Sequence, residues 1–213
     1  MACKVLVVCG SPVVASADLL RRLAGECDHV VAVDRGLDAL LSAGLGCDVY
    51  VGDADTVSEA GRALVDAAED FEVERHDPYK DYTDLALALD TIRRRWPATE
   101  LVTTCATGGR PDMALSVLGL LAGYTDAPVW IAEDEVTARI LHQNEAWTIE
   151  DAAGKTFSII AIAPNTEISE HGLEWELDHA TLGLLADTGI SNVVRGTAKI
   201  QVHTGTAIAY LFK

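Results

Sequence analysis

Short strand-like runs alternate with helix-like segments from the start of the chain to about residue 132. The runs are rich in β-branched side chains, and the segments between them carry leucine and alanine at helical spacing. Regular alternation predicts an α/β fold, a parallel sheet with helices on both faces, because the crossovers between parallel strands usually carry helices. The expected strands are Lys4–Cys9, Val30–Val33, 48–52, Phe71–Glu74, Leu101–Cys105 and Val129–Ala132. The clearest expected helices are Asp81–Arg95 and Pro111–Leu121.

Beyond Glu133 the helical period is lost and further strand-like runs follow. They are Val136–Leu141, Trp147–Glu150, Phe157–Ala163 and Ile200–Leu211, the last with a hairpin-like turn at His203–Thr206. We therefore expect a Rossmann-like α/β domain at residues 1–133 and a smaller antiparallel β domain at residues 134–213. About 80 residues build only a marginal core, so the second domain is expected to pack against a partner surface.

Composition and charge exclude several classes of protein. Hydrophobic residues make up 49% of the 213 residues, which argues against disorder. The formal net charge of −17 disfavours nucleic acid and anionic membranes as partners. The five cysteines include no Cys-x-x-Cys pair and their odd number argues against a disulfide framework. With no expected signal peptide or membrane span, we expect a cytoplasmic protein.

Polar residues gather where the expected parallel strands end. Ligands of open parallel sheets bind beyond the carboxyl ends of the strands. Asp34 follows the second strand, and Asp53 and Asp55 follow the third in the turn Gly52-Asp53-Ala54-Asp55. Two further groups lie at the same edge: Lys80, Asp81, Thr83 and Asp84, then Gly108, Gly109, Arg110 and Asp112. Crowded carboxylates repel one another unless a cation binds among them, and Mg²⁺ prefers carboxylate and phosphate oxygens.

Each of these residues also has a purely structural interpretation. Asp81 could cap a helix, Gly108 and Gly109 could serve a tight turn, and Thr56 with Glu59 could form a capping box. Helix starts alone do not need so many carboxylates at one rim. Lys80 and Arg110 supply the basic groups that a polyphosphate needs. With no P-loop and no Gly-x-Gly-x-x-Gly motif after the first strand, the pattern favours metal-assisted phosphoryl-group transfer on another nucleotide-binding sheet.

Six motifs resemble those of the thiamine pyrophosphokinase family in order and spacing, and together they cover nearly the whole chain. They are Val33–Gly36, Gly52–Thr56, Lys80–Asp84, Thr107–Asp112, Gly172–Leu177 and Gly189–Asn192. The resemblance implies transfer of the pyrophosphoryl group of ATP to the hydroxyl of thiamine, giving thiamine diphosphate and AMP. It also implies Mg²⁺, a β-sandwich second domain, and a homodimer with active sites at the subunit interface.

The resemblance and the rim position together suggest a role for each residue. Asp53 and Asp55 would hold Mg²⁺, with Asp84 as a further ligand or water anchor, and Lys80 and Arg110 would neutralise phosphate oxygens. The other residues expected on the ATP side are Asp34, Gly52, Asp81, Thr83, Gly108, Gly109 and Asp112. Asp34 and Asp112 are also candidates for the acceptor hydroxyl. Residues expected on the thiamine side are Trp175, Ser191, Asn192 and Tyr210, although Trp175 and Tyr210 could instead be core aromatics.

The sequence departs from the family pattern at four positions. Arg35 stands where the family usually has a second glycine, and Ala54 where it usually has an aromatic residue. Met113 replaces a polar residue, and Val193 replaces the glutamate that often follows Ser-Asn. The expected Mg²⁺ and phosphate residues are intact. The acceptor stays open between thiamine and another heterocyclic alcohol such as a hydroxymethylpterin, and a non-catalytic nucleotide- or thiamine-binding relative is a further alternative.

Overall fold

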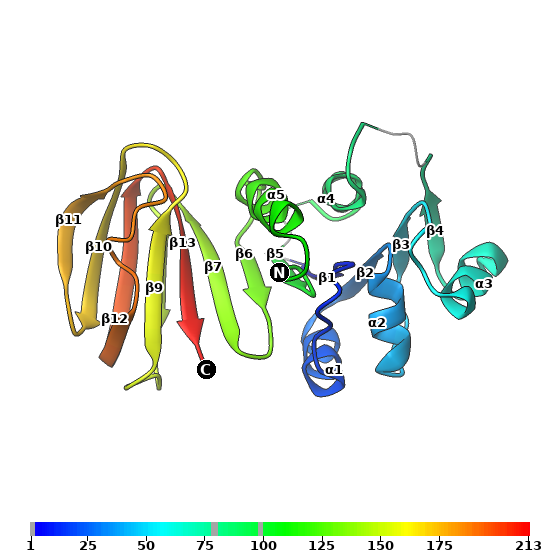
Figure 1. Ribbon diagram of the computed structural model, residues 1–213, viewed down its shortest axis with the longest axis horizontal. Helices are drawn as coiled ribbons and strands as arrows, with labels where there is room; N and C mark the ends of the chain where they lie inside the picture. Colours follow the sequence, from blue (N-terminus) through cyan, green and yellow to red (C-terminus); the bar gives the residue numbers. More distant parts are fainter. Residues whose placement is uncertain (1–2, 78–80, 98–99) are drawn as a thin grey trace. The chain divides into compact units, whose positions relative to one another are not determined.

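A computed structural model describes residues 3–77, 81–97 and 100–213 of the chain. They form two compact units, Met1–Asp134 and Glu135–Lys213 (Figure 1). The first unit contains helices and strands, and the described part of the second contains strands and no helix. The predicted class, an α/β unit followed by a β unit, is confirmed. The finer descriptions, Rossmann-like and β-sandwich, stay predictions.

Parallel strands make up the sheet of the first unit. They are β1 (Lys4–Val8), β2 (His29–Val33), β3 (Val49–Gly52), β4 (Glu72–Arg75), β5 (Glu100–Thr104) and β6 (Val129–Ala132). The strand order is β6–β5–β1–β2–β3–β4, and every pairing between these strands is parallel, as predicted. The chain runs from β1 to β4 on one side and then returns to β5 on the other. The order therefore reverses between β1 and β5, where a ligand crevice is expected.

Helices cover both faces of this sheet. They are α1 (Ala17–Glu26), α2 (Gly36–Ser42), α3 (Glu59–Ala67), α4 (Asp84–Arg95) and α5 (Pro111–Ala122). Figure 1 shows α1 and α2 on one face and α4 and α5 on the other, and α3 packs beside α2. Within the described ranges, no helix is both long enough and apolar enough to cross a lipid bilayer.

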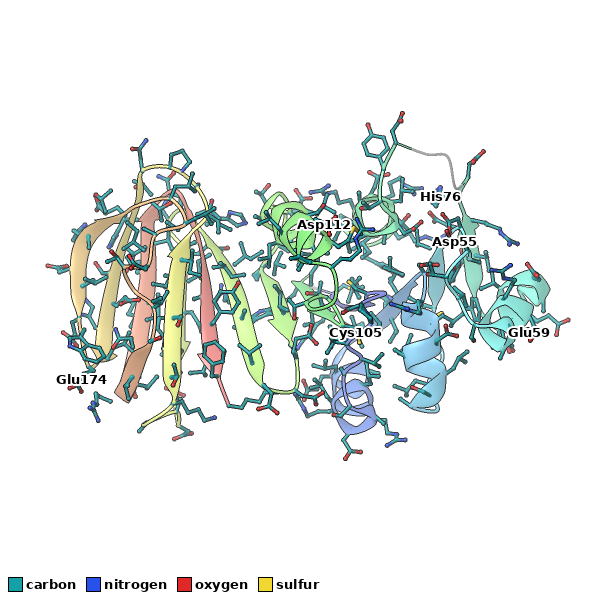
Figure 2. All side chains as sticks on the ribbon, in the orientation of Figure 1. Asp55, Glu59, His76, Cys105, Asp112 and Glu174 are labelled. Atoms are coloured by element: carbon teal, nitrogen blue, oxygen red, sulfur yellow. The ribbon has the colours of Figure 1, made fainter. Side chains whose placement is uncertain are left out.

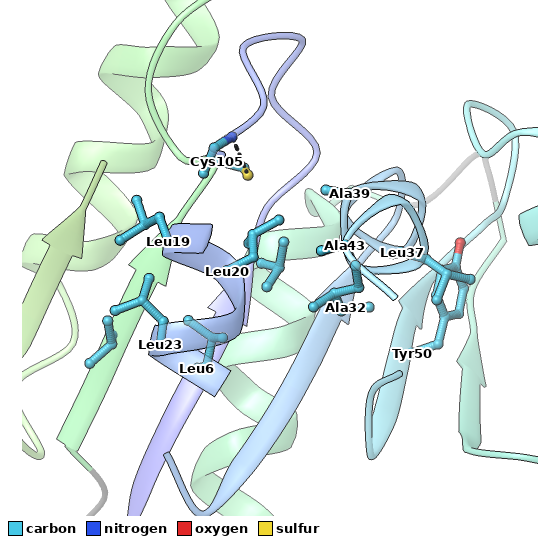
Figure 3. Close-up of a cluster of buried hydrophobic side chains, with 14 of the residues drawn as sticks. Leu6, Leu19, Leu20, Leu23, Ala32, Leu37, Ala39, Ala43, Tyr50 and Cys105 are labelled. Carbon is cyan, nitrogen blue, oxygen red and sulfur yellow. Dashed lines mark hydrogen bonds between the residues drawn. The ribbon is translucent and has the colours of Figure 1, made fainter. Parts of the chain in front are cut away.

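The core beneath α1 and α2 explains why these segments are helical. Leu19, Leu20 and Leu23 lie on the buried side of α1, at the spacing of one helical face. Figure 3 shows them packed near Leu6 of β1, and Leu40 of α2 is fully buried in the same cluster. Burying one leucine side chain contributes about 1.5–3 kcal/mol, so this cluster fixes the helices on the sheet.

The start of α4 differs from the prediction. Thr83 is the N-cap, and its hydroxyl accepts a hydrogen bond of 3.3 Å from the backbone N–H of Ala86. The helix begins at Asp84, so both the predicted start and the capping role of Asp81 are wrong. Threonine and aspartate are both favoured N-cap residues, and the sequence Asp-Tyr-Thr-Asp offers both.

The predicted capping box at the start of α3 is also wrong. Ser58 is the N-cap, and its hydroxyl accepts a hydrogen bond of 3.1 Å from the backbone N–H of Gly61. The Thr56 hydroxyl instead donates to the carboxylate of Asp34. A residue that looked like a helix cap therefore belongs to the turn where the carboxylates gather.

Antiparallel strands build the second unit. They are β7 (Val136–His142), β8 (Ala146–Ile149), β9 (Thr156–Ala161), β10 (Thr166–Leu173), β11 (Leu177–Leu182), β12 (Asn192–Thr204) and β13 (Thr206–Phe212). A turn with Gly205 at a positive φ of 77° separates β12 from β13, but the predicted hairpin is wrong, because β9 lies between these two strands in the sheet order and pairs with both. The long strand β12 pairs with β9 at its start and with β10 and β8 farther on. Strands β10 and β11 were not predicted.

A charged side chain is buried in this unit. Glu170 of β10 is fully buried, between Leu177 of β11 and Ile200 of β12 in the strand register. Neither carboxylate oxygen has a hydrogen bond of ordinary geometry within the described residues. Burial raises the pKa of the Glu170 carboxyl from 4.5 to about 7, with the Asn192 amide acting weakly in the opposite direction. The folded unit therefore favours the protonated acid.

We predict that Glu170→Gln removes a pH dependence of stability. Between pH 4.5 and about pH 7 the folded protein binds more protons at Glu170 than the unfolded chain. The free energy of unfolding therefore falls as pH rises through this window, by about 3 kcal/mol in total. Urea unfolding at pH 5 and pH 8 should show that loss for the wild-type protein and a smaller one for Glu170→Gln. Glu150→Gln, at an exposed position of the same unit, is the control. Equal pH profiles for Glu170→Gln and wild type would contradict the prediction.

Candidate active site

Three carboxylates meet at the carboxyl edge of the parallel sheet. Asp34 follows β2, and Asp53 and Asp55 follow β3; one ligand oxygen of each lies within 4.8 Å of the others. We call Asp34, Asp53 and Asp55 the carboxylate trio; Figure 2 labels Asp55. The structure brings together Asp53 and Asp55, as predicted. The third member of the trio is Asp34, which was expected to contact the nucleotide or the acceptor. Asp84, the predicted third ligand, lies outside the trio.

Backbone turns and hydrogen bonds hold the trio in place. Asp34 and Ala54 have positive φ angles of 47° and 64°, which turn the chain sharply after each strand. The hydroxyls of Thr56 and Tyr50 donate to the two carboxylate oxygens of Asp34, the second at 3.5 Å. The backbone N–H of Asp55 donates to Oδ1 of Asp53 at 3.1 Å. These bonds satisfy only part of the acceptor capacity of three carboxylates.

The site has a strongly negative potential. Burial, the hydrogen bond with Asp53 and the charges of Asp53, Asp34 and Asp84 raise the pKa of Asp55. Burial raises the pKa of Tyr50 as well, with Asp34, Asp84 and Asp53 adding to it. Asp84 is thus a fourth carboxylate in the same field. The donor set consists of hard oxygen atoms, which fits Mg²⁺ rather than a metal that prefers nitrogen or sulfur ligands.

A cavity of about 450 Å³ opens where the strand order reverses. Its walls come from the ends of β1, β2 and β5 and from the starts of α4 and α5. The predicted site residues that line it are Asp34, Thr83, Asp84, Gly108 and Arg110, and two of the family departures, Arg35 and Met113, line it as well. Because Asp34 also belongs to the trio, the cavity and the proposed metal ligands form one site.

Other predicted residues of the ATP side lie around this cavity without lining it. Gly52, Asp81, Gly109 and Asp112 are outside its walls. Lys80, which was expected to bind phosphate, lies outside the described residues. Gly108 and Gly109 have positive φ angles of 106° and 71°, and a side chain on them would meet Val13 and Pro12. The tight-turn interpretation of the two glycines is therefore correct, and Gly108 also forms part of the wall.

Arg110 and Asp112 form an ion pair at the start of α5. Nε and Nη2 of Arg110 donate to the two oxygens of Asp112 at 3.1 and 2.5 Å. The Arg110 guanidinium is the main reason why the pKa of Asp112 is lowered. Both side chains are exposed, and Figure 2 labels Asp112 at this helix start. The structure thus places Asp112 as a partner of Arg110.

Glu133 supports the loop between β5 and α5, a role that the sequence analysis did not foresee. Its two oxygens accept hydrogen bonds from the backbone N–H groups of Cys105, Ala106 and Thr107 at 3.1, 2.9 and 3.2 Å. The Thr107 hydroxyl donates to the same carboxylate at 3.3 Å. Glu133 directly follows β6, so the rule that collected the other strand-end carboxylates could have found it.

The residues expected on the thiamine side come together in the second unit. The Asn192 side chain is buried. Its Nδ2 donates to the backbone oxygen of Trp175 at 2.7 Å, and its Oδ1 accepts from the backbone N–H of Trp175 at 3.2 Å. The backbone N–H of Ser191 donates to the Ser158 hydroxyl at 3.0 Å, and Tyr210 lies opposite Ser158 in the strand register. Trp175 is 63% exposed, so it is not a core aromatic. Tyr210 is half-buried.

Family models match both units. A model of the thiamin pyrophosphokinase catalytic domain matches residues 20–133, and a model of the thiamin pyrophosphokinase vitamin B1 binding domain matches residues 143–208. The chain belongs to the thiamin pyrophosphokinase family. The resemblance deduced from the sequence motifs is therefore confirmed. The carboxylate trio, Arg110 and most of the cavity wall lie in the part that matches the catalytic domain, and residues 9–12 of the wall precede it.

Individual relatives agree with this assignment. Thiamine pyrophosphokinase 1 of Arabidopsis thaliana is 24% identical in an alignment of 180 residues that covers 76% of this chain and 64% of that protein. The match therefore spans less than two thirds of that relative. The crystal structure of thiamine pyrophosphokinase from Bacillus subtilis has a TM-score of 0.81 at 24% identity, over 99% of both chains. Thiamin pyrophosphokinase from Candida albicans has a TM-score of 0.81 at 15% identity, over 99% of this chain and 89% of its own. Both structures share the fold.

We predict that Glu133→Gln destabilises the first unit. The substitution turns one acceptor oxygen into an NH₂ group that faces backbone N–H donors. Hydrogen bonds to a charged group contribute about 1.5–3 kcal/mol, so we expect a loss of about 2 kcal/mol in urea unfolding. Glu135→Gln, two residues along and exposed, should change stability by less than about 0.5 kcal/mol. Equal unfolding midpoints for the two variants would show that Glu133 does not hold the loop.

Proposed function

We propose that this chain is a thiamine pyrophosphokinase that transfers the pyrophosphoryl group of ATP to thiamine. The observation that carries the proposal is the carboxylate trio beside a cavity that Arg110 and Asp84 also line. In the reaction the hydroxyl oxygen of thiamine bonds to the β-phosphorus of ATP. The bond from that phosphorus to the oxygen bridging to the α-phosphate breaks, AMP leaves, and the proton of the thiamine hydroxyl is released to solvent.

The trio would hold Mg²⁺, and Asp84, whose charge acts on Asp55, is proposed as a further ligand or as the anchor of a bound water. When bound, Mg²⁺ would neutralise charge on the polyphosphate, which a chain of net charge −17 otherwise repels. Arg110, with its guanidinium oriented by Asp112, would contact phosphate oxygens, and Lys80 is proposed for the same role. Positioning and charge neutralisation are expected to supply most of the rate, as in other phosphoryl transfers.

Residues of the second unit would bind thiamine. Trp175 offers an exposed aromatic face, and Asn192 fixes the backbone on which that indole is carried. Ser191 and Tyr210 complete the proposed set. Aromatic faces attract cationic rings such as the thiazolium of thiamine, which supports this assignment.

We predict that Asp53→Asn lowers AMP release by at least about 100-fold while the protein stays folded. The residue lies in a turn at the sheet edge, so the loss should come from weaker Mg²⁺ binding rather than from unfolding. A coupled assay for AMP with thiamine and MgATP measures the effect. Asp70→Asn, at an exposed position after α3, is the control.

The same assay separates the alternative functions. AMP release with a hydroxymethylpterin but not with thiamine would assign another acceptor. Nucleotide binding without AMP release would assign a non-catalytic protein. Wild-type activity in folded Asp53→Asn would remove the trio from the mechanism.

We also propose that the protein is a homodimer. The second unit exposes large apolar side chains, among them Trp175, Leu185 and Ile190 at 63%, 63% and 45%. Apolar surface of this kind is usually covered by a partner. Trp147, another large aromatic side chain of this unit, is buried and does not add to this surface.

Light scattering at micromolar concentration should therefore give twice the chain mass of 22.7 kDa. On dilution, specific activity should fall in step with dissociation, if the dimer is the active form. A fully active monomer would refute the assembly but leave the proposed reaction standing.

A further inference from the structure

Arg35 lies in the wall of the nucleotide cavity and makes no salt bridge within the part of the chain that the structure describes. Its Nη2 donates one hydrogen bond of 3.0 Å to the backbone oxygen of Gly10 at the end of β1. A guanidinium has five N–H donors, so most of them remain available. A half-buried cation without a carboxylate partner is unusual in a chain with 33 acidic and 16 basic residues.

The backbone of Arg35 is rigidly placed. A Cβ on the next residue, Gly36, would lie 1.9 Å from the backbone oxygen of Val8, so this turn sits directly on β1. The N–H of Asp38 donates to the backbone oxygen of Arg35 at 3.0 Å, and the N–H of Leu37 donates to that of Asp34 at 3.1 Å. Adjacent residues of one turn thus carry a carboxylate of the trio and a guanidinium of the cavity wall.

Arg35 differs from the other cation of the cavity. In the described residues, the cationic side chains that line it are Arg35 and Arg110. Arg110 already uses Nε and Nη2 on Asp112, so its charge is partly neutralised and three of its five N–H donors remain. Arg35 has given up only one N–H, to a neutral carbonyl. An incoming polyphosphate therefore displaces no ion pair at Arg35.

We propose that Arg35 binds the polyphosphate of the nucleotide directly, as a charge supplied from the turn after β2. The inference rests on the proposed function, because it assumes that the cavity takes a nucleoside triphosphate. The planar fork of a guanidinium matches the oxygens of phosphate groups and can bind two at once. The ligand class is a nucleoside triphosphate, and affinity should depend on Arg35 more strongly as the number of phosphates increases.

Calorimetric titration with Mg²⁺ and three ligands tests the proposal: AMP, ADP and α,β-methylene ATP, whose α–β linkage cannot be cleaved. Arg35→Ala should raise the Kd of the ATP analogue by about 10- to 100-fold and that of AMP by less than about 2-fold. The KM for ATP should rise by a similar factor while the KM for thiamine stays the same. Arg35→Lys, which keeps the charge but not the fork, should recover part of the affinity.

Arg21→Ala is the matched control. Nε of Arg21 also donates to a backbone oxygen, that of Ala43 at 3.0 Å, but Arg21 does not line the cavity. Its removal should leave all three Kd values unchanged.

Three outcomes would overturn the inference. An unchanged Kd for the analogue in Arg35→Ala, together with lower thermal stability, would mean that Arg35 only holds the Gly10 loop. Equal losses for AMP and the analogue would place Arg35 at the nucleoside or the α-phosphate. Failure of the wild-type protein to bind the analogue would overturn the proposed function itself, and the inference with it.

Discussion

Repulsion among carboxylates at one edge of the parallel sheet is the constraint on which the active-site half of this protein depends. Unit charges as close as those of the trio repel each other by about 1 to 3 kcal/mol per pair, according to the local dielectric. Hydrogen bonds from Thr56, Tyr50 and the backbone of Asp55 offset part of this cost. The pKa of Asp55 is raised, first by burial and the hydrogen bond with Asp53 and then by the charges of Asp53, Asp34 and Asp84. A cation bound among these side chains, as proposed above, would reduce this repulsion and so stabilise this edge of the sheet.

The loops at the carboxyl edge of the sheet also determine which groups can bind an anion. Backbone N–H groups after a strand often bind phosphate, but those of Cys105, Ala106 and Thr107 are occupied by Glu133. Anion binding in this part of the cavity therefore falls to side chains. This explains why arginine is useful at position 35 here, where a glycine would leave the cavity with fewer charges.

Most of the fold follows from sequence pattern, and parts of the site do not. The parallel strands were predictable because their apolar runs are continuous and buried on both faces. Strands β10 and β11 were missed because inward positions such as Ser169 and Glu170 are polar, which breaks the alternation. The strand-end rule found Asp34, Asp53 and Asp55 but could not separate them from Asp84 and Asp112, which lie outside the trio, since this depends on turn geometry. Thr56 was misassigned because a threonine that caps a helix and one that binds a carboxylate look alike in sequence.

Three turns at the carboxyl edge of the sheet each contain a residue that is not glycine but has a left-handed backbone conformation. Asp34, Ala54 and Cys105 follow the ends of β2, β3 and β5 with φ angles of 47°, 64° and 50°. Each costs about 1 kcal/mol, and each is stabilised by the loop around it. Asp34 donates its backbone N–H to Val51 at 3.0 Å, and Cys105 donates its own to Glu133. Since the strained turn at Asp34 directs its carboxylate to the trio, it also fixes the path of the next residue. The geometry that places a proposed metal ligand therefore places the Arg35 guanidinium as well, and the two charges meet the nucleotide as one rigid unit.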